Sequence, residues 1–239
     1  MAKQNAINIR FYVQGDDLSG DANSIDGVGV NQSLLGVNTI DSAANKRITG
    51  LQDGTLGLSV WFDAATGHEH DVFTANSGTT PSVDQNVLVP MGSAVGDSSV
   101  HMVAKIANYN VSTGDGSAPV SGTASFESTG SAPQFGIMLT AHKDTHATST
   151  SGTAVDNSVS SANGGSAVLQ VFSLASGSSI IKIQHSTNNV TYTDLITFDS
   201  VTDKASQNAT VTGTVNQYLR VRSTGTFTDL VLSVDFARG

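Results

Sequence analysis

Apolar and polar residues alternate with a period of two through much of the C-terminal part of the chain. The alternation is clearest in residues 180–185, 216–222 and 230–236. It places one face of each strand on a core and the other face in water. Residues that favour turns punctuate the pattern at 186–189, at Gly213 and at 223–225. Residues 168–238 are therefore predicted to form a small antiparallel β-sandwich or jelly roll.

The N-terminal half also predicts strands, with longer interruptions between them. Alternating segments cover residues 6–13, 28–35 and 55–62, and the first ends at a turn rich in Gly and Asp, residues 15–20. Asp53-Gly54 stands just before the third segment, where an Asp-Gly pair favours a hairpin turn. Gly54 is therefore expected to adopt a positive φ that a β-branched residue would resist. Residues 41–50 fit either a helical turn or a long loop.

One short helix is predicted at about residues 66–77. Thr66 and Glu69 have the spacing of a capping box, and Val72 and Phe73 would share a face. Further strands are predicted at residues 86–90, 101–109, 120–128 and 135–140. The fold class is thus mainly β, with one short helix in the first half and a small antiparallel β-sandwich in the second.

A segment of loop-like composition divides the chain. Residues 141–165 are rich in Ser, Thr, Asn and Gly, with two valines as the only sizeable apolar side chains. We predict a linker or long loop there, between a first domain at residues 1–140 and a second at residues 166–239.

Composition narrows the classes of protein that fit. Only 13% of the 239 residues are charged, about half the usual fraction. The absence of cysteine excludes disulfides and every cysteine-based metal site. No apolar run approaches the roughly 20 residues of a membrane span, and residues 1–5 lack the apolar region of a signal peptide. We expect no membrane insertion, and synthesis in the cytoplasm.

The negative charge is concentrated in the first half. The net charge is −9. Residues 1–140 contain 5 basic and 13 acidic side chains, 5 − 13 = −8, and residues 141–239 contain 6 and 7, 6 − 7 = −1. An acidic surface repels nucleic acid, because affinity for phosphate comes mainly from Lys and Arg. DNA binding is not expected, although DNA passing nearby is compatible with this charge.

Three clusters of His and acidic residues are candidate metal sites. His68-Glu69-His70-Asp71 offers ligand side chains, but two His at i and i+2 of a helix point about 200° apart, which favours a solvated first helical turn. His142 and His146 have the i, i+4 spacing, but their surroundings favour a flexible linker over a helix. Asp16, Asp17 and Asp21 do not match the EF-hand pattern, so a turn is the better interpretation.

No motif for catalysis is present. No Ser lies in a Gly-x-Ser-x-Gly motif, and no glycine cluster matches a phosphate-binding loop. The chain contains only two Glu, Glu69 and Glu127, so a carboxylate pair for glycoside hydrolysis has little support. Trp61 and Tyr192 could stack on sugars, but aromatic residues in alternating strands are more often core. The chain is not expected to be an enzyme, and no cofactor is expected.

Two blocks of sequence carry a family resemblance. The N-terminal block covers residues 11–21, 24–26 and 47–56, with a turn of the form Asp-x-Leu-Ser-Gly at residues 16–20 and a Gly-Leu-x-Asp-Gly run at 50–54. The C-terminal block covers residues 181–195, 216–221 and 224–227. Together they resemble the major tail proteins, or tail tube proteins, of long-tailed bacteriophages, especially those of actinobacterial phages. The second block is similar to the β domain appended to such proteins.

The resemblance implies a structural protein of the virion tail, assembled in the host cytoplasm. It also implies that the first domain is a tail-tube-like β-sandwich or barrel with one short helix. It implies hexameric rings that stack into a tube through which DNA passes, with the tape measure, tail terminator and distal tail proteins as further partners. The acidic half would then line the lumen, and the second domain would lie outside. The acidic residues implied at the lumen or in ring-stacking loops are Asp16, Asp17, Asp21, Asp41 and Asp53.

Two other functions remain open at this point. One is a carbohydrate-binding or adhesion module, with Trp61, Tyr192 and Tyr218 as stacking surfaces. The other is a capsid decoration protein, which would share the composition and the lack of catalytic motifs.

Overall fold

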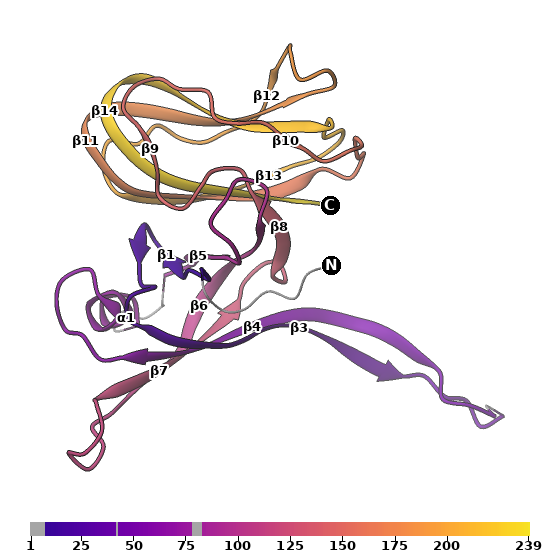
Figure 1. The fold of residues 1–239 in the computed structure, drawn as a ribbon. Coiled ribbons are helices and arrows are strands. Elements are labelled where there is room, and N and C mark those ends of the chain that lie inside the picture. The colour runs from indigo at the N-terminus through magenta and orange to yellow at the C-terminus, as the bar shows by residue number, and fades with distance from the viewer. Residues whose placement is uncertain (1–7, 42, 78–82) are drawn as a thin grey trace.

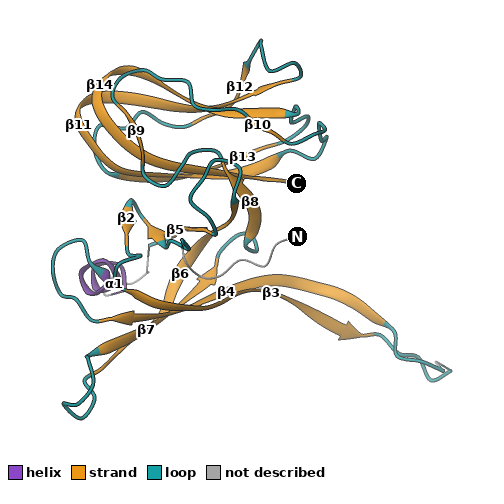
Figure 2. Cartoon of the chain, in the orientation of Figure 1, coloured by secondary structure: helices purple, strands orange, loops and turns teal. Residues whose placement is uncertain are grey.

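The chain folds into two β units stacked on one another and joined by a shared sheet (Figure 1). The computed structural model describes residues 8–41, 43–77 and 83–239. Strands dominate and a single short helix lies at one side of the first unit (Figure 2). The mainly β fold class predicted from the sequence is confirmed.

The first unit contains eight strands and the helix. Their bounds are β1 (Tyr12–Val13), β2 (Asp16–Asp17), β3 (Ala22–Gly36), β4 (Arg47–Trp61), α1 (Glu69–Ser77), β5 (Gln85–Pro90), β6 (Ser98–Ser112), β7 (Ser121–Ser128) and β8 (Gln134–Met138). β3, β4, β7 and β6 pair in this order as antiparallel neighbours. Buried Phe11, Phe73 and Phe126 pack together with tilted and edge-to-face rings at the centre of the first core.

The second unit is a sandwich built around one long strand pair. Its strands are β9 (Asp144–His146), β10 (Val155–Asp156), β11 (Gly165–Ser186), β12 (Thr193–Thr197), β13 (Ala205–Val211) and β14 (Tyr218–Arg238). β11 and β14 pair from Gly165↔Arg238 to Ser186↔Tyr218. Their curved ribbons pass from one layer of the sandwich to the other (Figure 1).

Two glycines lie midway along this strand pair. Gly177 and Gly225 have φ of +88° and +131°, values that side chains with a Cβ rarely adopt. A Cβ on Gly177 would lie 2.0 Å from the carbonyl oxygen of Thr226, and one on Gly225 would lie 2.3 Å from that of Ser178. Glycine therefore lets both strands continue through the bend without a break.

Buried polar side chains fasten the second unit to the first. β8 pairs with both β6 and β14, so one sheet crosses the junction. The fully buried Gln170 of β11 accepts a hydrogen bond from the Gly15 amide at 2.7 Å and donates one to the Asn86 carbonyl at 2.7 Å. A small apolar cluster of Tyr12, Leu88, Met138 and Val168 lies beside these bonds. The two units are held as neighbours by contacts that a flexible tether would not provide.

Residues 141–165, predicted as a linker or long loop, run along the second unit and include two short strands. β9 pairs with β14 at Leu230↔His146, and β10 pairs with it at Val155↔Leu219. His146 is buried and its Nδ1 lies 2.8 Å from the Ser223 hydroxyl. The segment lies along β14, because its many small polar residues can form hydrogen bonds with the edge of that strand without needing an apolar core of their own.

Most predicted strands are confirmed, several of them with longer bounds. The segments 28–35 and 55–62 lie within β3 and β4, apart from Phe62, and 101–109 lies within β6. Of the first predicted strand, only Tyr12–Val13 is β1, and residues 6 and 7 lie outside the described part of the chain. The segment 41–50 was open between a helical turn and a long loop. Its residues 41 and 43–46 lie in the connection between β3 and β4, and its residues 47–50 are the start of β4. Residue 42 is not described.

Two predicted turns are wrong. Asp53-Gly54 lies inside β4, where Gly54 pairs with Val30 and has no positive φ. Residues 223–225 lie inside β14 and pair with residues 179–181. Glycine is needed in both segments for reasons other than a turn. Gly225 permits the bend in β14. At Gly54 there is no room for a side chain, because a Cβ would lie 2.0 Å from Pro133 Cδ. Sequence alone does not separate these uses of glycine from a turn.

The helix is confirmed, but the capping box is wrong. α1 begins at Glu69, and Val72 and Phe73 share its buried face. The Glu69 carboxylate does not reach back to Thr66; it accepts the Asp63 amide at 2.9 and 3.0 Å. Asp21 accepts the Glu69 amide at 3.2 Å and so caps the helix from another segment of the chain.

The close approach of Pro133 gives a first prediction. Gly54→Ala should lower the free energy of unfolding by about 1–3 kcal/mol, because the new methyl group overlaps the proline ring. Thermal unfolding measures the change. Gly36→Ala is the matched control, since nothing lies within 4 Å of a Cβ there, and it should change stability by less than about 0.5 kcal/mol. A Gly54→Ala/Pro133→Ala double variant should recover stability; equal losses in the single and double variants would contradict this reason.

Candidate assembly surface

The most exposed feature of the molecule is a long hairpin that projects beyond the body. We call residues 30–54, the outer part of β3 and β4 with the turn between them, the arm. Figure 1 shows it extending away from both units. β4 pairs with β7 only over residues 55–61, and β3 pairs only with β4 among the described strands. The arm is therefore a two-stranded ribbon with both hydrogen-bonding edges open.

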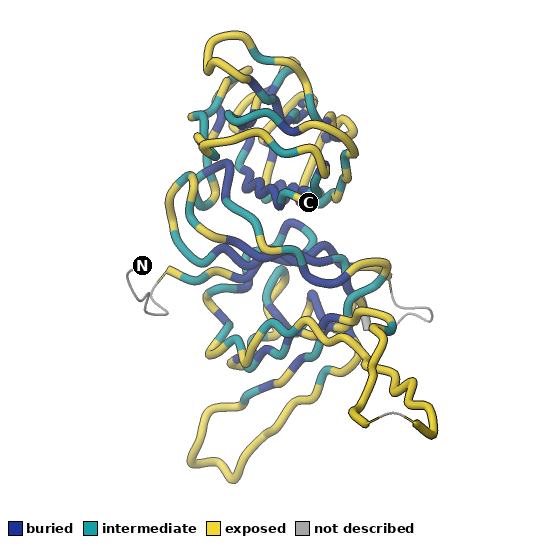
Figure 3. The backbone as a smooth tube through the Cα atoms, turned by 90° about the vertical axis from the view of Figure 1, so that its right-hand side faces the viewer, coloured by how far each residue is buried: buried dark blue, intermediate teal, exposed yellow. Residues whose placement is uncertain are grey.

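Large apolar side chains are exposed along the whole arm. Leu35 and Ile48 pair across the two strands and lie on one face, whereas Leu34 pairs with Thr49 and lies on the other. Ile40 at the tip is fully exposed and Leu51 is 88% exposed. The exposed apolar residues of the arm are Val30, Leu34, Leu35, Val37, Ile40, Ile48 and Leu51. Figure 3 shows the arm and the β6–β7 hairpin as the two largely exposed hairpins of the first unit.

Such a ribbon is incomplete as a structural element. An isolated two-stranded hairpin is at best marginally stable in water, and open edges and apolar patches are features that proteins normally cover. Among the described residues, the body does not cover the arm. The arm can bind through both its side chains and its open strand edges.

A cluster of charged side chains fixes the base of the arm. Asp21 precedes β3, Asp63 follows β4 and His68 precedes α1. His68 Nδ1 lies 3.0 Å from Asp21 Oδ1 and 3.3 Å from Asp63 Oδ2. The hydrogen bond with Asp21, and then its charge, raise the pKa of His68. When His68 is protonated, it links the residues that flank β3 and β4 to the start of the helix.

The structure shows that the four residues 68–71 do not act as one cluster. His70 lies apart from His68, with its Nδ1 3.1 Å from the Tyr109 hydroxyl. Burial, and then the charge of Glu69, raise the pKa of Tyr109 to about 12. The partners of His68 are Asp21 and Asp63, whose separation in sequence hides them from spacing arguments. The three donor groups lie within 4.8 Å of one another and could hold a divalent cation, but hydrogen bonds among them already account for the geometry.

The five acidic residues implied by the family resemblance do not come together. Asp16 pairs with Lys204 at 2.9 Å and Asp17 with Lys143 at 3.2 Å, so both connect the two units. Asp21 lies at the base of the arm. Asp41 and Asp53 are exposed on the arm itself. Asp16 and Asp17 form the short strand β2 and only Asp21 lies in a turn, so the predicted turn at these residues is only partly present.

The two histidines His142 and His146, predicted as a possible cluster, also have separate partners. His142 Nδ1 lies 3.2 Å from the Tyr12 hydroxyl, whereas His146 contacts Ser223, so the two His serve different contacts. Burial lowers the pKa of both histidines.

The two aromatic residues considered for sugar stacking are not buried. Trp61 is 43% exposed, and Tyr192 is half-buried with the Arg220 guanidinium 3.7 Å from its ring centre. Neither aromatic residue is core, contrary to the favoured interpretation.

Ser166, His101 and Asp235 form a buried chain of hydrogen bonds that the sequence did not suggest. His101 Nε2 lies 2.9 Å from the Ser166 hydroxyl and Nδ1 lies 2.7 Å from Asp235 Oδ2. Asp235 also accepts the Ser99 hydroxyl and the Val168 amide. The connectivity matches a Ser-His-Asp triad, but the adjoining cavity of ≈ 30 Å³ holds about one water molecule. The chain of bonds joins β6 to β11 and β14.

No signal in the sequence reveals this network. Asp235 fits the alternating pattern of residues 230–236 as an outward polar residue, and His101 begins another alternating strand. Only the pairing of β14 with β8, and of β8 with β6, brings the two side chains together.

In the described part of the chain, a helix with the length and apolar character of a membrane span is absent.

Comparison with known proteins gives loose likenesses. No protein-family model matches the chain, and no curated protein matches it. Among solved structures, a chain from the virion of a native gene transfer agent particle is 14% identical, with 56% of this chain and 98% of that chain covered and a TM-score of 0.42. The Dit protein of phage SPP1 is 11% identical, with coverages of 96% and 99% and a TM-score of 0.32. A chain from the phage p2 baseplate is 6% identical, with coverages of 97% and 98% and a TM-score of 0.38. TM-scores below 0.5 describe a loose overlap from which we infer no function.

The base of the arm should respond to pH through His68. Its raised pKa means that its contribution to stability is fully present below about pH 6.5 and is lost as pH rises through the folded value. Trp61 is the only tryptophan and its amide bonds the Asp21 carbonyl, so its fluorescence reports this region. Urea unfolding followed by Trp61 should show a stability loss as the pH rises above about 6.5, and His68→Gln should remove this loss. The same pH dependence in His68→Gln would assign the effect to other groups.

The buried network predicts a structural role. Asp235→Asn should lower the free energy of unfolding by about 3 kcal/mol, because it leaves buried donors without their acceptor. For a chain of this size the melting temperature should fall by about 10 °C. Ser166→Ala should cost about 1 kcal/mol, since it removes one hydrogen bond. Covalent labelling of Ser166 by a fluorophosphonate would contradict the structural role.

Proposed function

We propose that this chain is a structural protein of a phage virion tail that self-assembles through its arm. The observation that carries the proposal is the two-stranded arm, which exposes apolar side chains on both faces and keeps both strand edges open. A monomer that keeps such a surface in water is aggregation-prone. Ordered contact with further copies removes the same exposure in a defined way.

The family resemblance of residues 11–21, 24–26 and 47–56 supports a ring as the form of assembly. We propose hexameric rings that stack into a tail tube, with the tape measure, tail terminator and distal tail proteins as neighbours. Residues 1–140 would form the assembly domain, and residues 166–239 an outer domain. The contacts of Gln170 and Asp235 with the first unit fit an outer domain carried rigidly on the ring.

The charge distribution fits a channel that DNA passes without sticking. Residues 1–140 carry a net charge of −8, from 5 − 13, and a negative lumen repels phosphate. Asp16 and Asp17 are paired with lysines, so Asp41 and Asp53 are the acidic residues that we propose for the lumen or the stacking contacts.

Negative-stain electron microscopy of the purified chain tests the proposal. Rings that stack into tubes are the expected result. Single rings that never stack would retain ring assembly and reject the tube. Monodisperse monomers at all concentrations would reject self-assembly and leave a glycan-binding module or a decoration protein as the better candidates.

Leu35→Asp and Ile48→Asp test the role of the arm. Both side chains are exposed in the monomer and lie on one face, so a charge there should leave the melting temperature of the monomer unchanged. Each should weaken assembly by about 30-fold or more, the size expected for a central interface residue. Sedimentation velocity measures the assembly. Val190→Asp is the control at an exposed apolar position of the second unit, and it should assemble normally. Normal assembly of Leu35→Asp and Ile48→Asp would contradict this role of the arm.

A further inference from the structure

A polar groove lies between the two units, where β13 comes beside β5. Its volume is ≈ 660 Å³, which falls in the range of small-molecule sites. Ser206, Asn208 and Thr210 alternate along β13 and therefore form one wall with a single face of that strand. Residues of β5, β6 and the loop between β7 and β8 contribute to the opposite wall. Short polar side chains on both walls leave the space between them open.

Five side chains in the groove keep hydrogen-bonding groups that the described part of the chain does not use. Asn86 and Asn208 each offer a side-chain amide, and Thr129, Ser131 and Thr210 each offer a hydroxyl. None of these five groups bonds another described residue. An amide side chain can donate and accept, and so can a hydroxyl. The groove therefore presents both kinds of hydrogen-bonding group from both of its walls.

Asn86 is the side chain that the fold leaves most clearly incomplete. The residue is only 9% exposed, and its backbone carbonyl already accepts a hydrogen bond from Gln170 at 2.7 Å. Val87 packs in the first core, so the side chain of Asn86 points the other way, toward the second unit. Its amide has no partner among the described residues, and it is not sealed from solvent. Buried polar groups normally have a partner, and a ligand in the groove can supply one.

The lining of the groove selects the class of ligand. Among the described lining residues, Asp84 is the only one with a charged side chain, and Lys105 pairs with it at 2.8 Å. An anionic ligand would find no unpaired cation there. Val103 is the only lining residue with a sizeable apolar side chain, so an apolar ligand would leave the amides and hydroxyls without partners. A neutral molecule with many hydroxyls fits this lining.

Saccharides are the neutral molecules of this kind. A sugar ring carries hydroxyls around its whole edge, and each of them can donate and accept. A peptide backbone offers its donors and acceptors on separate groups. Matching groups on two facing walls therefore favour a saccharide over a peptide segment.

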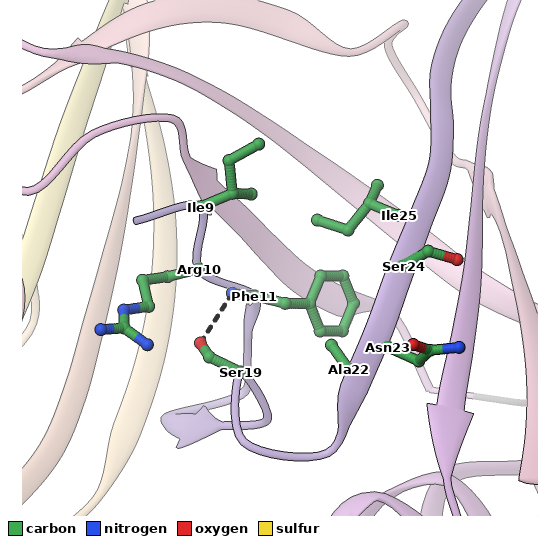
Figure 4. A pocket seen from close by; sticks show the side chains of 8 residues that line it. All are labelled: Ile9, Arg10, Phe11, Ser19, Ala22, Asn23, Ser24 and Ile25. Atoms are coloured by element: carbon green, nitrogen blue, oxygen red, sulfur yellow. Dashed lines mark hydrogen bonds between the residues drawn. The ribbon is translucent and has the colours of Figure 1, made fainter. Parts of the chain in front are cut away.

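A smaller hollow beside β3 lacks this chemistry. Its volume is ≈ 230 Å³, and Ile9, Phe11 and Ile25 lie around it (Figure 4). The hydroxyls of Ser19 and Ser24 in its lining already bond neighbouring carboxylates, and Ser19 also accepts the Phe11 amide at 3.0 Å. Because its hydroxyls are used within the chain, this hollow is an internal reference for saccharide binding.

We propose that the groove binds a short neutral saccharide whose hydroxyls bond Asn86 on one wall and Asn208 on the other. The site goes beyond the proposed function and does not depend on self-assembly, because its residues lie outside the arm. Both units contribute to it, and the buried bonds of Gln170 and Asp235 hold the two walls at a fixed separation.

The side-chain amides of Asn86 and Asn208 report binding directly in nitrogen–proton correlation spectra. Leu35→Asp is introduced into the full chain to keep it monomeric, and it lies outside the groove. The probes are neutral mono- and disaccharides of glucose, galactose, mannose and N-acetylglucosamine, each added up to about 50 mM. At least one probe should shift both amides saturably, with a dissociation constant of about 1 mM or lower. The backbone amide of Ile25, in the reference hollow, should not shift.

Two variants locate the binding. Asn208→Ala and Thr210→Val should each weaken it by about threefold to tenfold, the loss expected for one hydrogen bond. Both side chains are exposed and bond no described residue, so the melting temperature should stay unchanged. Asn23→Ala, at an exposed residue of the reference hollow, is the matched control and should leave the affinity unchanged.

The contrary outcomes are equally defined. No saturable shift with any probe would overturn the saccharide site, and so would an equal shift at Ile25 or with glycerol at the same concentration. Binding that Asn208→Ala and Thr210→Val leave unchanged would place the sugar elsewhere. Loss of the two amide signals when the protein alone is concentrated would assign the groove to a second copy. Assembly without saccharide binding would reject this site and leave the proposed function standing, whereas binding by a chain that never assembles would do the reverse.

Discussion

Two strands cannot cover both of their own faces or both of their own edges, and the outer halves of β3 and β4 form a ribbon of this kind. The rest of the first unit is arranged around its base. Asp21, Asp63 and His68 fix the two strands to α1, and the Phe11, Phe73 and Phe126 rings pack beneath them. The body is therefore a rigid support for an element that is complete only in contact with another surface.

The second unit contributes rigidity rather than chemistry. β11 and β14 remain paired through a bend that Gly177 and Gly225 permit, so a single strand pair forms both layers of the sandwich. Gln170 and Asp235 then fasten this pair to β5 and β6 by buried hydrogen bonds. Ser166, His101 and Asp235 have the connectivity of a catalytic triad, and the adjoining cavity of ≈ 30 Å³ holds about one water molecule. The same bonds hold the two units in a fixed position relative to one another.

The sequence predicted the fold class and most strands because alternation with a period of two is a local property. It failed where one residue type serves several purposes. Gly54 and Gly225 have the appearance of turn residues, but one makes room for Pro133 and the other permits a bend inside a strand. The partners of His68 and His101 lie 47 and 134 residues away, and only strand pairing brings them close. The projection of the arm was equally invisible, because exposed and buried strands share the same alternation.

Hydrogen exchange of the arm tests the central claim most directly. Backbone amides of residues 30–36 and 47–54 should exchange rapidly in the dilute monomer and slowly in the assembled protein, while amides of β5 stay protected in both. Such a change would show that a second copy covers the arm. Slow exchange of the arm in the monomer, or equally fast exchange in the assembly, would contradict the account.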